Sequence, residues 1–308
     1  MAEPTWIAAH VFHRGDQDLL VSHAMAPLCA ELLHCGQIDD WFFLRYWEGG
    51  PHVRLRLRVT GNVQEVRTAV ADTCARHLTD HPSPPDTWTQ ERYQAIARHR
   101  AAAEPMTRWQ RRLRPVDTVE FTAYRPEHRT YGTGIALRAV ERHFTDSSRI
   151  AAALLTTPRD RRAAVALAML TLTTAVCEPD LARASARFTT TTQLPERYRD
   201  QARLLWSHAS RNPAPTDPLA VWLHSIRAVH TTLTALRETG GFAPDDVLSR
   251  FAGLARALCP DDPLVPCVVL RCAHLLCNRL GLSAATEARL VDLTTASLSA
   301  LHDEVAPP

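Results

Sequence analysis

The stretch that decides the fold is Trp41–Val59, which reads WFFLRYWEGGPHVRLRLRV. Two apolar runs rich in aromatic residues flank Glu48–Pro51, the sequence Glu-Gly-Gly-Pro. Apolar runs interrupted by such a turn predict a β-hairpin, here with a loop of about four residues.

The second run of this hairpin alternates strictly between apolar and basic residues. Side chains on a strand have a period of two, so one face is expected to carry valine and leucine and the other Arg54, Arg56 and Arg58. Successive arginines are expected about 6.6 Å apart, with His52 at the head of the row. A row of planar guanidinium groups can bind an anion that has two carboxylates. The polar face of a half-exposed antiparallel sheet gives the same alternation, so the hairpin alone leaves both interpretations open.

Composition limits the class of protein. The chain has 308 residues, enough for one large domain or two ordinary ones, and it is 45% hydrophobic and 22% charged, which is typical of a globular protein with a sizeable core. The net charge of +2 gives no general argument for nucleic-acid or membrane binding. All 35 basic residues are arginine, so Schiff-base chemistry and lysine-dependent phosphate loops are excluded.

The sequence also indicates a compartment and shows no metal-binding pattern. It contains no apolar stretch long enough to span a membrane and no basic segment ahead of an apolar run at its start, so no signal peptide is predicted. Eight cysteines fit a reduced, cytoplasmic protein with buried thiols. The spacing of Cys272, His274 and Cys277 matches no zinc pattern, so we expect no metal and no organic cofactor.

The first part of the chain predicts alternating strands and helices. Strands are expected at Trp6–Phe12 and at 116–123, on either side of the hairpin. Two amphipathic helices are expected between them, one capped by Asp16 and ended by Gly36, and one running from Asn62 to Leu78. A polar helical stretch at 88–103 reads as an insertion over the surface. Without it the order is β-α-β-β-α-β, and the fold class is α+β with a ferredoxin-like βαββαβ antiparallel sheet.

After residue 134 the pattern is helical throughout. Proline and glycine separate the segments, and the helices are expected at 135–155, 159–176, 195–209, 217–237, 244–258, 264–280 and 284–302. They predict a C-terminal helical bundle. We expect one domain over 1–308, with a sheet portion at 5–124 and a helical portion at 134–306.

Two further stretches carry residues suited to chemistry. The first is Tyr124–Gly132, YRPEHRTYG, at the end of the last strand, where polar loops commonly form sites. A plain strand-to-helix connection has the same composition. The second is His274–Arg279, HLLCNR, on an otherwise apolar helix. A histidine and an arginine there need partners, and a satisfied core histidine is the structural alternative.

Together these stretches, with ERHFTDSS at 141–148, resemble the C-terminal, glutamate-eliminating domain of the lantibiotic dehydratases and the stand-alone proteins built on it in thiopeptide biosynthesis. In that family a partner domain uses glutamyl-tRNA to esterify Ser or Thr of a precursor peptide. The eliminating domain then expels glutamate to leave dehydroalanine or dehydrobutyrine.

The resemblance implies roles for individual residues. The paired strand arginines of the family fall on Arg54 and Arg56, and its late catalytic histidine falls on His274. A further family arginine, in an Arg-Tyr-Gly motif, falls on Thr130, which is a departure. Arg129 is adjacent and could substitute only if it faces the same way. Residues near these positions are expected to bind substrate: His52, Arg58, Glu127, Arg129, Thr130, Tyr131, Asn278 and Arg279.

The chemistry of elimination suits these residue types. Guanidinium groups can hold the carboxylates of a glutamyl group and stabilise enolate charge. A histidine can move the proton, because its pKa lies near working pH. The hypothesis is that Arg54, Arg56 and His274 are catalytic and meet in one anion-lined pocket. The expected partners are a precursor peptide with its leader and glutamylated core, and a separate glutamyl-tRNA-dependent glutamylation subunit. A homodimer is possible, and no direct contact with nucleic acid or membrane is expected.

Two alternatives stay open. A thiopeptide pyridine synthase, which joins two dehydroalanines by a formal aza-[4+2] cycloaddition and releases the leader peptide, resembles the same domain. Thr130 favours this alternative, while Arg54, Arg56 and His274 favour elimination. The second alternative is a non-catalytic module that docks a leader peptide on the sheet.

Overall fold

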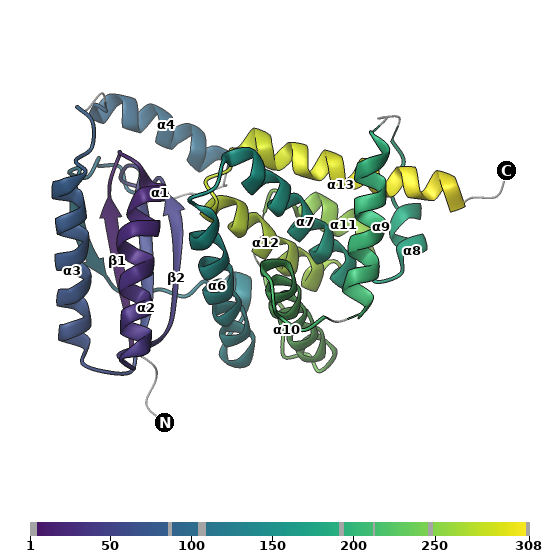
Figure 1. The fold of residues 1–308 in the computed structure, drawn as a ribbon, viewed down its shortest axis with the longest axis horizontal. Helices are drawn as coiled ribbons and strands as arrows, with labels where there is room; N and C mark the ends of the chain where they lie inside the picture. Colours follow the sequence, from purple (N-terminus) through teal and green to yellow (C-terminus); the bar gives the residue numbers. More distant parts are fainter. Residues whose placement is uncertain are drawn as a thin grey trace. The chain divides into compact units, whose positions relative to one another are not determined.

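The structure is a computed structural model that describes residues 5–85, 88–103, 109–190, 194–211, 213–245 and 249–305. The chain divides into two compact units. The first runs to Arg125 and includes Ala151–Thr156; the second consists of Pro126–Ile150 and the chain from Thr157 onward. The first unit holds the β-sheet and the second is helical (Figure 1).

The first unit is built on a four-stranded antiparallel sheet in the order β2-β3-β1-β4. Its strands are β1 (Thr5–Phe12), β2 (Ile38–Tyr46), β3 (His52–Val59) and β4 (Thr118–Thr122). The predicted hairpin is confirmed as β2 and β3, and β3 lies inside the sheet between β2 and β1. The expectation of a mixed α+β protein is confirmed.

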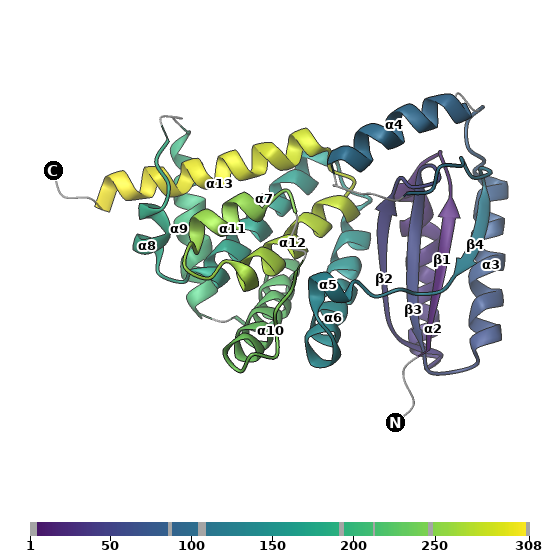
Figure 2. The same cartoon turned by 180° about the vertical axis from the view of Figure 1, so that it is seen from behind.

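Helices cover the apolar face of this sheet, where the valine and leucine side chains of β3 are buried. They are α1 (Gln17–Leu19), η1 (Leu20–Met25), α2 (Ala26–His34) and α3 (Val63–Asp80). Asp16 and Asn62 cap α1 and α3 by accepting backbone N–H groups of the first turn, as predicted. Figure 2 shows α2 and α3 on the same side of the sheet, where α2 packs on β2, and α3 on β1 and β4.

The polar stretch expected to be a surface insertion forms α4 (Gln90–Ala103), but it is not only a surface feature. Tyr93, Ala97 and Ala101 are buried in a cluster with Trp47, which lies in the β2–β3 loop. The Tyr93 hydroxyl accepts a hydrogen bond from the Gly49 backbone N–H at 2.8 Å and donates to the Gln110 carbonyl. One large and two small residues at intervals of four make a narrow apolar stripe. The polar composition of the rest of the helix made this stripe hard to recognise from the sequence.

The second unit contains α5 (His128–Tyr131), α6 (Gly134–Leu154), α7 (Arg159–Cys177), α8 (Leu181–Ala186), α9 (Glu196–Arg211), α10 (Pro218–Glu238), α11 (Ala252–Leu258), α12 (Leu264–Arg279) and α13 (Ala284–Val305). Most of these match the expected ranges. The central helix is α7, which is buried on nearly every side from Ala166 to Val176 and packs against α9, α10, α12 and α13. A helix that is apolar all round is typical of such a position.

Three details of this unit differ from the expectation. The short helices α5 and α8 were not expected. The helix expected at 244–258 begins at Ala252; residues 246–248 of that range lie outside the described residues. The backbone N–H of Asp245, at the start of the expected helix, donates to the carbonyl of Arg129 at 3.0 Å. This bond connects Asp245 to α5 instead of to a helical turn of its own.

Candidate functional site

The face of the sheet opposite the helices carries the arginine row. His52, Arg54, Arg56 and Arg58 all face this side, since they alternate with the buried apolar residues of β3. The register places His10 of β1 beside Arg54. We call this surface the arginine face.

Arg54 is fixed by several neighbours. Its Nε donates to His52 Nε2 at 3.2 Å, and one Nη lies 3.4 Å from a Glu48 carboxylate oxygen. The guanidinium carbon lies 3.4 Å from the centre of the Tyr46 ring, within range of a cation–π contact. His52 itself is fully buried, and its Nδ1 lies 2.9 Å from the Gly50 carbonyl. Because a carbonyl can only accept, Nδ1 carries the proton of the neutral ring, which leaves Nε2 to accept from Arg54.

Arg56 has a matching arrangement with a different histidine. One Nη donates to His10 Nε2 at 3.2 Å, and another donates to the Leu55 carbonyl at 3.3 Å. An arginine is always a donor, so His10 Nε2 is the acceptor. His10 stacks on His52 with their ring centres 4.9 Å apart. Two neighbouring arginines are therefore each held by an imidazole nitrogen.

Both imidazoles are neutral at ordinary pH. Burial, followed by the charges of Arg56 and Arg54, lowers the pKa of His10 from 6.5 to about 2. The pKa of His52 falls from 6.5 to about 3, mainly through burial and against the hydrogen bond to Gly50, which raises it. The two histidines therefore add no positive charge to the arginine face; they direct the guanidinium groups.

Arg58 differs from the other two arginines. Its Nε lies 2.7 Å from an Asp39 oxygen and its Nη 2.7 Å from an Asp40 oxygen. Two carboxylates on β2 thus neutralise the end of the row. Arg58 stays a predicted substrate-binding residue, but its contacts suit the stabilisation of the strand pair.

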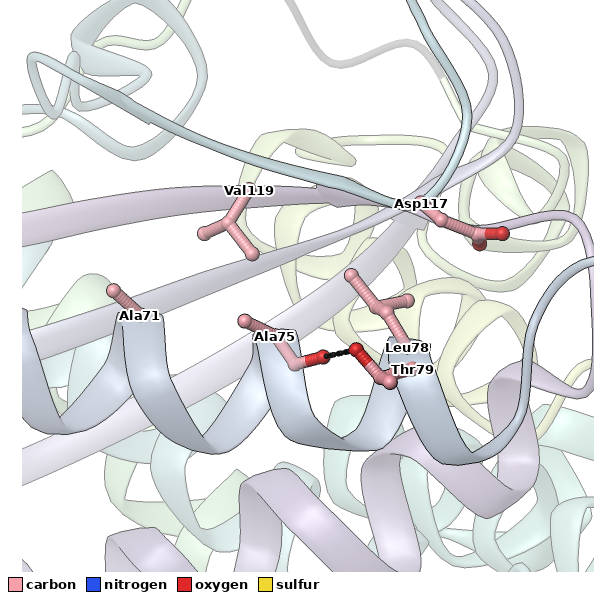
Figure 3. A pocket seen from close by; sticks show the side chains of 6 residues that line it. All are labelled: Ala71, Ala75, Leu78, Thr79, Asp117 and Val119. Atoms are coloured by element: carbon pink, nitrogen blue, oxygen red, sulfur yellow. Dashed lines mark hydrogen bonds between the residues drawn. The ribbon is translucent and has the colours of Figure 1, made fainter.

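The pocket found in the first unit lies away from the arginine face. It has a volume of about 320 Å³ and lies between α3 and β4, lined by Ala71, Ala75, Leu78, Thr79, Asp117 and Val119 (Figure 3). Val119 pairs with Val11, which pairs with Val53, so this pocket opens on the helix-covered side. It has one charged lining residue and is not the anion-lined pocket expected from the sequence.

In the second unit, the segment from Glu127 to Gly132 forms α5 and its ends. The Thr130 side chain is inside, at 2% exposure, and the Tyr131 ring packs edge-on against Phe144. Gly132 has a φ of +73°, and a Cβ there would lie 3.2 Å from Phe242, so the position favours glycine.

Arg129 leaves α5 on a different side from Thr130. Its side chain is 76% exposed and forms an ion pair with Asp245 at 3.1 Å. Adjacent residues of a helix point about 100° apart. The side chains of Arg129 and Thr130 therefore point in different directions, one exposed and one buried.

The late helix α12 presents a partly exposed stripe of Arg271, His274, Leu275 and Asn278, at the i, i+3, i+4 and i+7 spacing of one helix face. Burial of His274 is thus only partial. Its Nδ1 lies 3.2 Å from a carboxylate oxygen of Glu287, which is itself buried and also pairs with Arg250 at 3.2 Å. A carboxylate accepts from Nδ1–H, an arrangement that orients the ring and leaves Nε2 as the nitrogen for proton transfer.

Arg279 lies on the opposite side of α12 and is completely buried. Its Nε and Nη donate to the hydroxyls of Ser148 and Ser147 at 3.1 and 3.2 Å, and its guanidinium faces the Phe144 ring. Burial lowers its pKa from 12.5 to about 10, so it remains charged at neutral pH. These contacts join α12 to α6, which explains the HLLCNR and ERHFTDSS stretches as two sides of one buried polar contact. Its predicted contact with substrate stays untested.

The sequence-predicted residues fall into two groups. The arginine face brings together His52, Arg54, Arg56 and Arg58 in the first unit. The second unit holds Glu127, Arg129, Thr130, Tyr131, His274, Asn278 and Arg279. The predicted meeting of Arg54 and Arg56 with His274 joins residues of different units and stays a prediction.

Three residues near these groups were missed from the sequence. His10 alternates correctly on the first strand, and its place beside the arginines could be found once the strand order was assumed. Arg271 lies three residues before His274 and is visible as a helical neighbour. Glu287 comes from the next helix, and no local pattern marks it as the partner of His274.

Comparison with known proteins identifies the family. The family model described as the C-terminal part of the lantibiotic biosynthesis dehydratase matches residues 6–298. The chain therefore belongs to the lantibiotic dehydratase C-terminal family, as the sequence resemblance implied. Among curated proteins, none matches the chain.

Solved structures show the same fold at low sequence identity. The pyridine synthase TbtD from thiomuracin biosynthesis is 19% identical, with 98% of this chain and 100% of TbtD covered, at a TM-score of 0.70. TsrL is 18% identical, with 99% of this chain and 100% of TsrL covered, at a TM-score of 0.59. The tRNA-dependent lantibiotic dehydratase MibB from Microbispora sp. 107891 is 20% identical at a TM-score of 0.55, and this chain spans 29% of it.

Two further findings concern the described residues. Within the described ranges, no helix is both long and apolar enough to cross a membrane. In the same part of the chain, no group of three or more His, Cys, Asp or Glu side chains is arranged to hold a metal ion.

Proposed function

We propose that this protein is a pyridine synthase of thiopeptide type. It would join two dehydroalanines of a ribosomal precursor peptide by a formal aza-[4+2] cycloaddition and release the leader peptide. The observation that carries the proposal is the orientation of Arg129 and Thr130. The family's elimination motif has arginine where this chain has a buried threonine, and the adjacent arginine is exposed and paired with Asp245.

Overall similarity supports the same choice. The likeness to TbtD extends over both chains with a TM-score of 0.70, whereas the likeness to the MibB dehydratase has a TM-score of 0.55. The family is shared by both kinds of protein, so the difference between them must come from individual residues.

The residues of the two groups have chemical parts to play in this reaction. Arg54 and Arg56 are oriented donors that would bind carbonyl oxygens of the peptide and favour the enol-like form of an amide. The amide oxygen then leaves as water, and the leader leaves as the ring becomes aromatic. His274, with its ring held by Glu287, would carry the protons that the change of form and these two losses require. Substrate contacts of His52, Arg58, Glu127, Tyr131 and Asn278 belong to the same proposal.

Glutamate elimination is the second candidate, and one observation favours it. Arg54, Arg56 and His274 occupy the positions of the family's strand arginines and histidine, and Arg54 and Arg56 are held rigidly enough to bind a glutamyl group. In that case a separate glutamyl-tRNA-dependent subunit would supply the substrate.

The finer architecture is also a proposal. The strand order β2-β3-β1-β4 supports a ferredoxin-like βαββαβ sheet followed by a helical bundle, and the family match over 6–298 supports a single domain over 1–308. We further propose a cytoplasmic location and the precursor peptide as partner.

Mass spectrometry of two peptides tests the function. Purified protein is incubated with a synthetic peptide that contains two dehydroalanines, and separately with a glutamylated peptide. Formation of a pyridine with release of the leader segment supports the proposal. Loss of glutamate without cyclisation overturns it in favour of elimination, and binding of both peptides without turnover overturns it in favour of a docking module.

A further inference from the structure

Arg271 is the charged residue on the partly exposed stripe of α12, one helical turn before His274. Its Nε donates to the Tyr131 hydroxyl at 2.9 Å, and one Nη lies 2.9 Å from a Glu127 carboxylate oxygen. The side chain is 18% exposed and that of Glu127 is 53% exposed. The guanidinium is therefore fixed on the protein side by a buried tyrosine and meets a carboxylate on the solvent side.

The tyrosine gives the guanidinium a defined direction. Tyr131 is buried and packs on Phe144, and burial raises the pKa of its hydroxyl. A neutral hydroxyl accepts from Nε, and the planar guanidinium then holds the Nη that contacts Glu127 in a fixed direction. A fixed fork of this kind binds a carboxylate through two donors.

Glu127 is held at this position by little else. It is the N-cap residue of α5, but its side chain makes no capping hydrogen bond. An ion pair with a partner this exposed contributes little to stability. Exchange of Glu127 for another carboxylate on the same guanidinium therefore costs little free energy.

We propose that Arg271 is a carboxylate-binding residue of the substrate site, and that Glu127 occupies the place of the substrate's carboxylate until the peptide displaces it. The inference rests on the proposed function, in which the stripe of α12 with His274 faces the peptide. The carboxylate comes either from the peptide's C-terminus or from an acidic side chain, which share the same chemistry.

Direct binding measurements by calorimetry test this assignment. The probes are a synthetic peptide with two dehydroalanines, made with a C-terminal carboxylate or with a C-terminal amide, and glutarate as a side-chain analogue. The wild-type protein is expected to bind the carboxylate peptide or glutarate measurably, and Arg271→Gln to lose at least tenfold in affinity for that probe. Arg271→Lys should retain part of it, since the charge stays but the fork is lost.

Glu127→Gln distinguishes a binding residue from a structural ion pair. If Glu127 competes with the ligand, its replacement raises affinity for the carboxylate probe about threefold or more, which is the opposite of the Arg271→Gln effect. If the pair only supports the fold, both substitutions weaken binding alike, and the proposal is overturned. The matched controls are Arg237→Gln and Asp262→Asn, which break another ion pair of the same unit, at 3.1 Å, and should change neither affinity.

The two carboxylate sources give separate results. A difference between the carboxylate and amide peptides assigns the C-terminus, and binding of glutarate without that difference assigns an acidic side chain. If the two peptides bind equally and glutarate does not bind, the proposal is overturned. Thermal unfolding of each variant identifies any that fail to fold. If Arg271→Gln fails to fold, the affinities of Glu127→Gln and Arg271→Lys still test the proposal. Because binding is measured without turnover, absence of pyridine formation contradicts the proposed function alone.

Discussion

The arginine face of the sheet and the stripe of α12 hold their charged residues in different ways. On the sheet, Arg54 and Arg56 each donate to an imidazole that its lowered pKa keeps neutral, and Arg54 also lies 3.4 Å from a Glu48 carboxylate oxygen. On α12, Arg271 and His274 are each held by a glutamate. Neutral partners fix a cation without cancelling its charge, whereas acidic partners both fix and compensate it. The imidazoles therefore orient the sheet arginines without changing their charge, whereas the glutamates beside the α12 stripe add negative charge as they orient.

The largest expected effect separates the two sides of α12. Arg279→Met removes a buried charge but leaves Ser147 and Ser148 without their donor. A buried hydroxyl that loses its hydrogen-bond partner costs about 1–3 kcal/mol, and two hydroxyls are affected, which denaturant unfolding would measure. The control is Arg183→Ala, since that side chain is 66% exposed and its loss should shift stability by less than about 0.5 kcal/mol. Equal shifts in the two variants would contradict the structural part assigned to Arg279.

The next effect concerns the arginine face. Arg56→Ala is expected to lower turnover of the dehydroalanine peptide about 10²-fold, because an oriented donor is lost. Arg58→Ala should cost much less, since Asp39 and Asp40 already neutralise that residue. Steady-state kinetics measure both, with Arg100→Ala on the exposed side of α4 as control. A row that acts as one uniform charge would instead give similar losses for Arg56 and Arg58.

A smaller effect tests how His274 is held. Glu287→Gln keeps the size of the side chain but removes the charge that supports a protonated ring. We expect turnover to fall about tenfold, because the ring loses the carboxylate that orients it and a small misplacement of a reacting group is costly. A loss of stability with unchanged turnover of the folded variant would show that Glu287 only supports the fold.

The last effect is a pH dependence of stability. His10 and His52 have a pKa near 6.5 in the unfolded chain and about 2 and 3 in the folded protein. The unfolded state therefore binds more protons below pH 6.5, so stability is complete above that pH and falls as the pH drops toward 3. His52→Gln should flatten the dependence of Tm on pH between 7 and 4. An unchanged slope would show that the imidazole is already protonated in the folded state.

Much of the fold follows from local sequence signals. The strict alternation from Val53 to Val59 defines β3 and its two faces, and Asp16 and Asn62 mark the starts of helices by capping chemistry. The start of α11 was not predictable in this way, because the Asp245 N–H bonds to Arg129 across the unit, and tertiary contacts of that kind override local propensity.

The site could be predicted only in part. Arg54, Arg56 and His274 stand out because charged residues in apolar elements require partners. Their partners His10 and Glu287 lie far away in sequence or on another helix, so periodicity cannot reveal them. Arg279 shows another limit: its chemistry suggests a site, and only the structure reveals that it is buried and donates to two serine hydroxyls of α6.

The contact of α4 with the hairpin has a consequence for protein engineering. Glu48 accepts the Gln110 backbone N–H at 2.6 Å through one oxygen and lies 3.4 Å from Arg54 through the other. The segment between α3 and β4 thus fixes the β2–β3 loop, whose Glu48 contacts Arg54. Shortened versions of this protein should keep that segment. Its removal would take away a contact that holds Glu48, and with it Arg54, although no residue of the sheet had been changed.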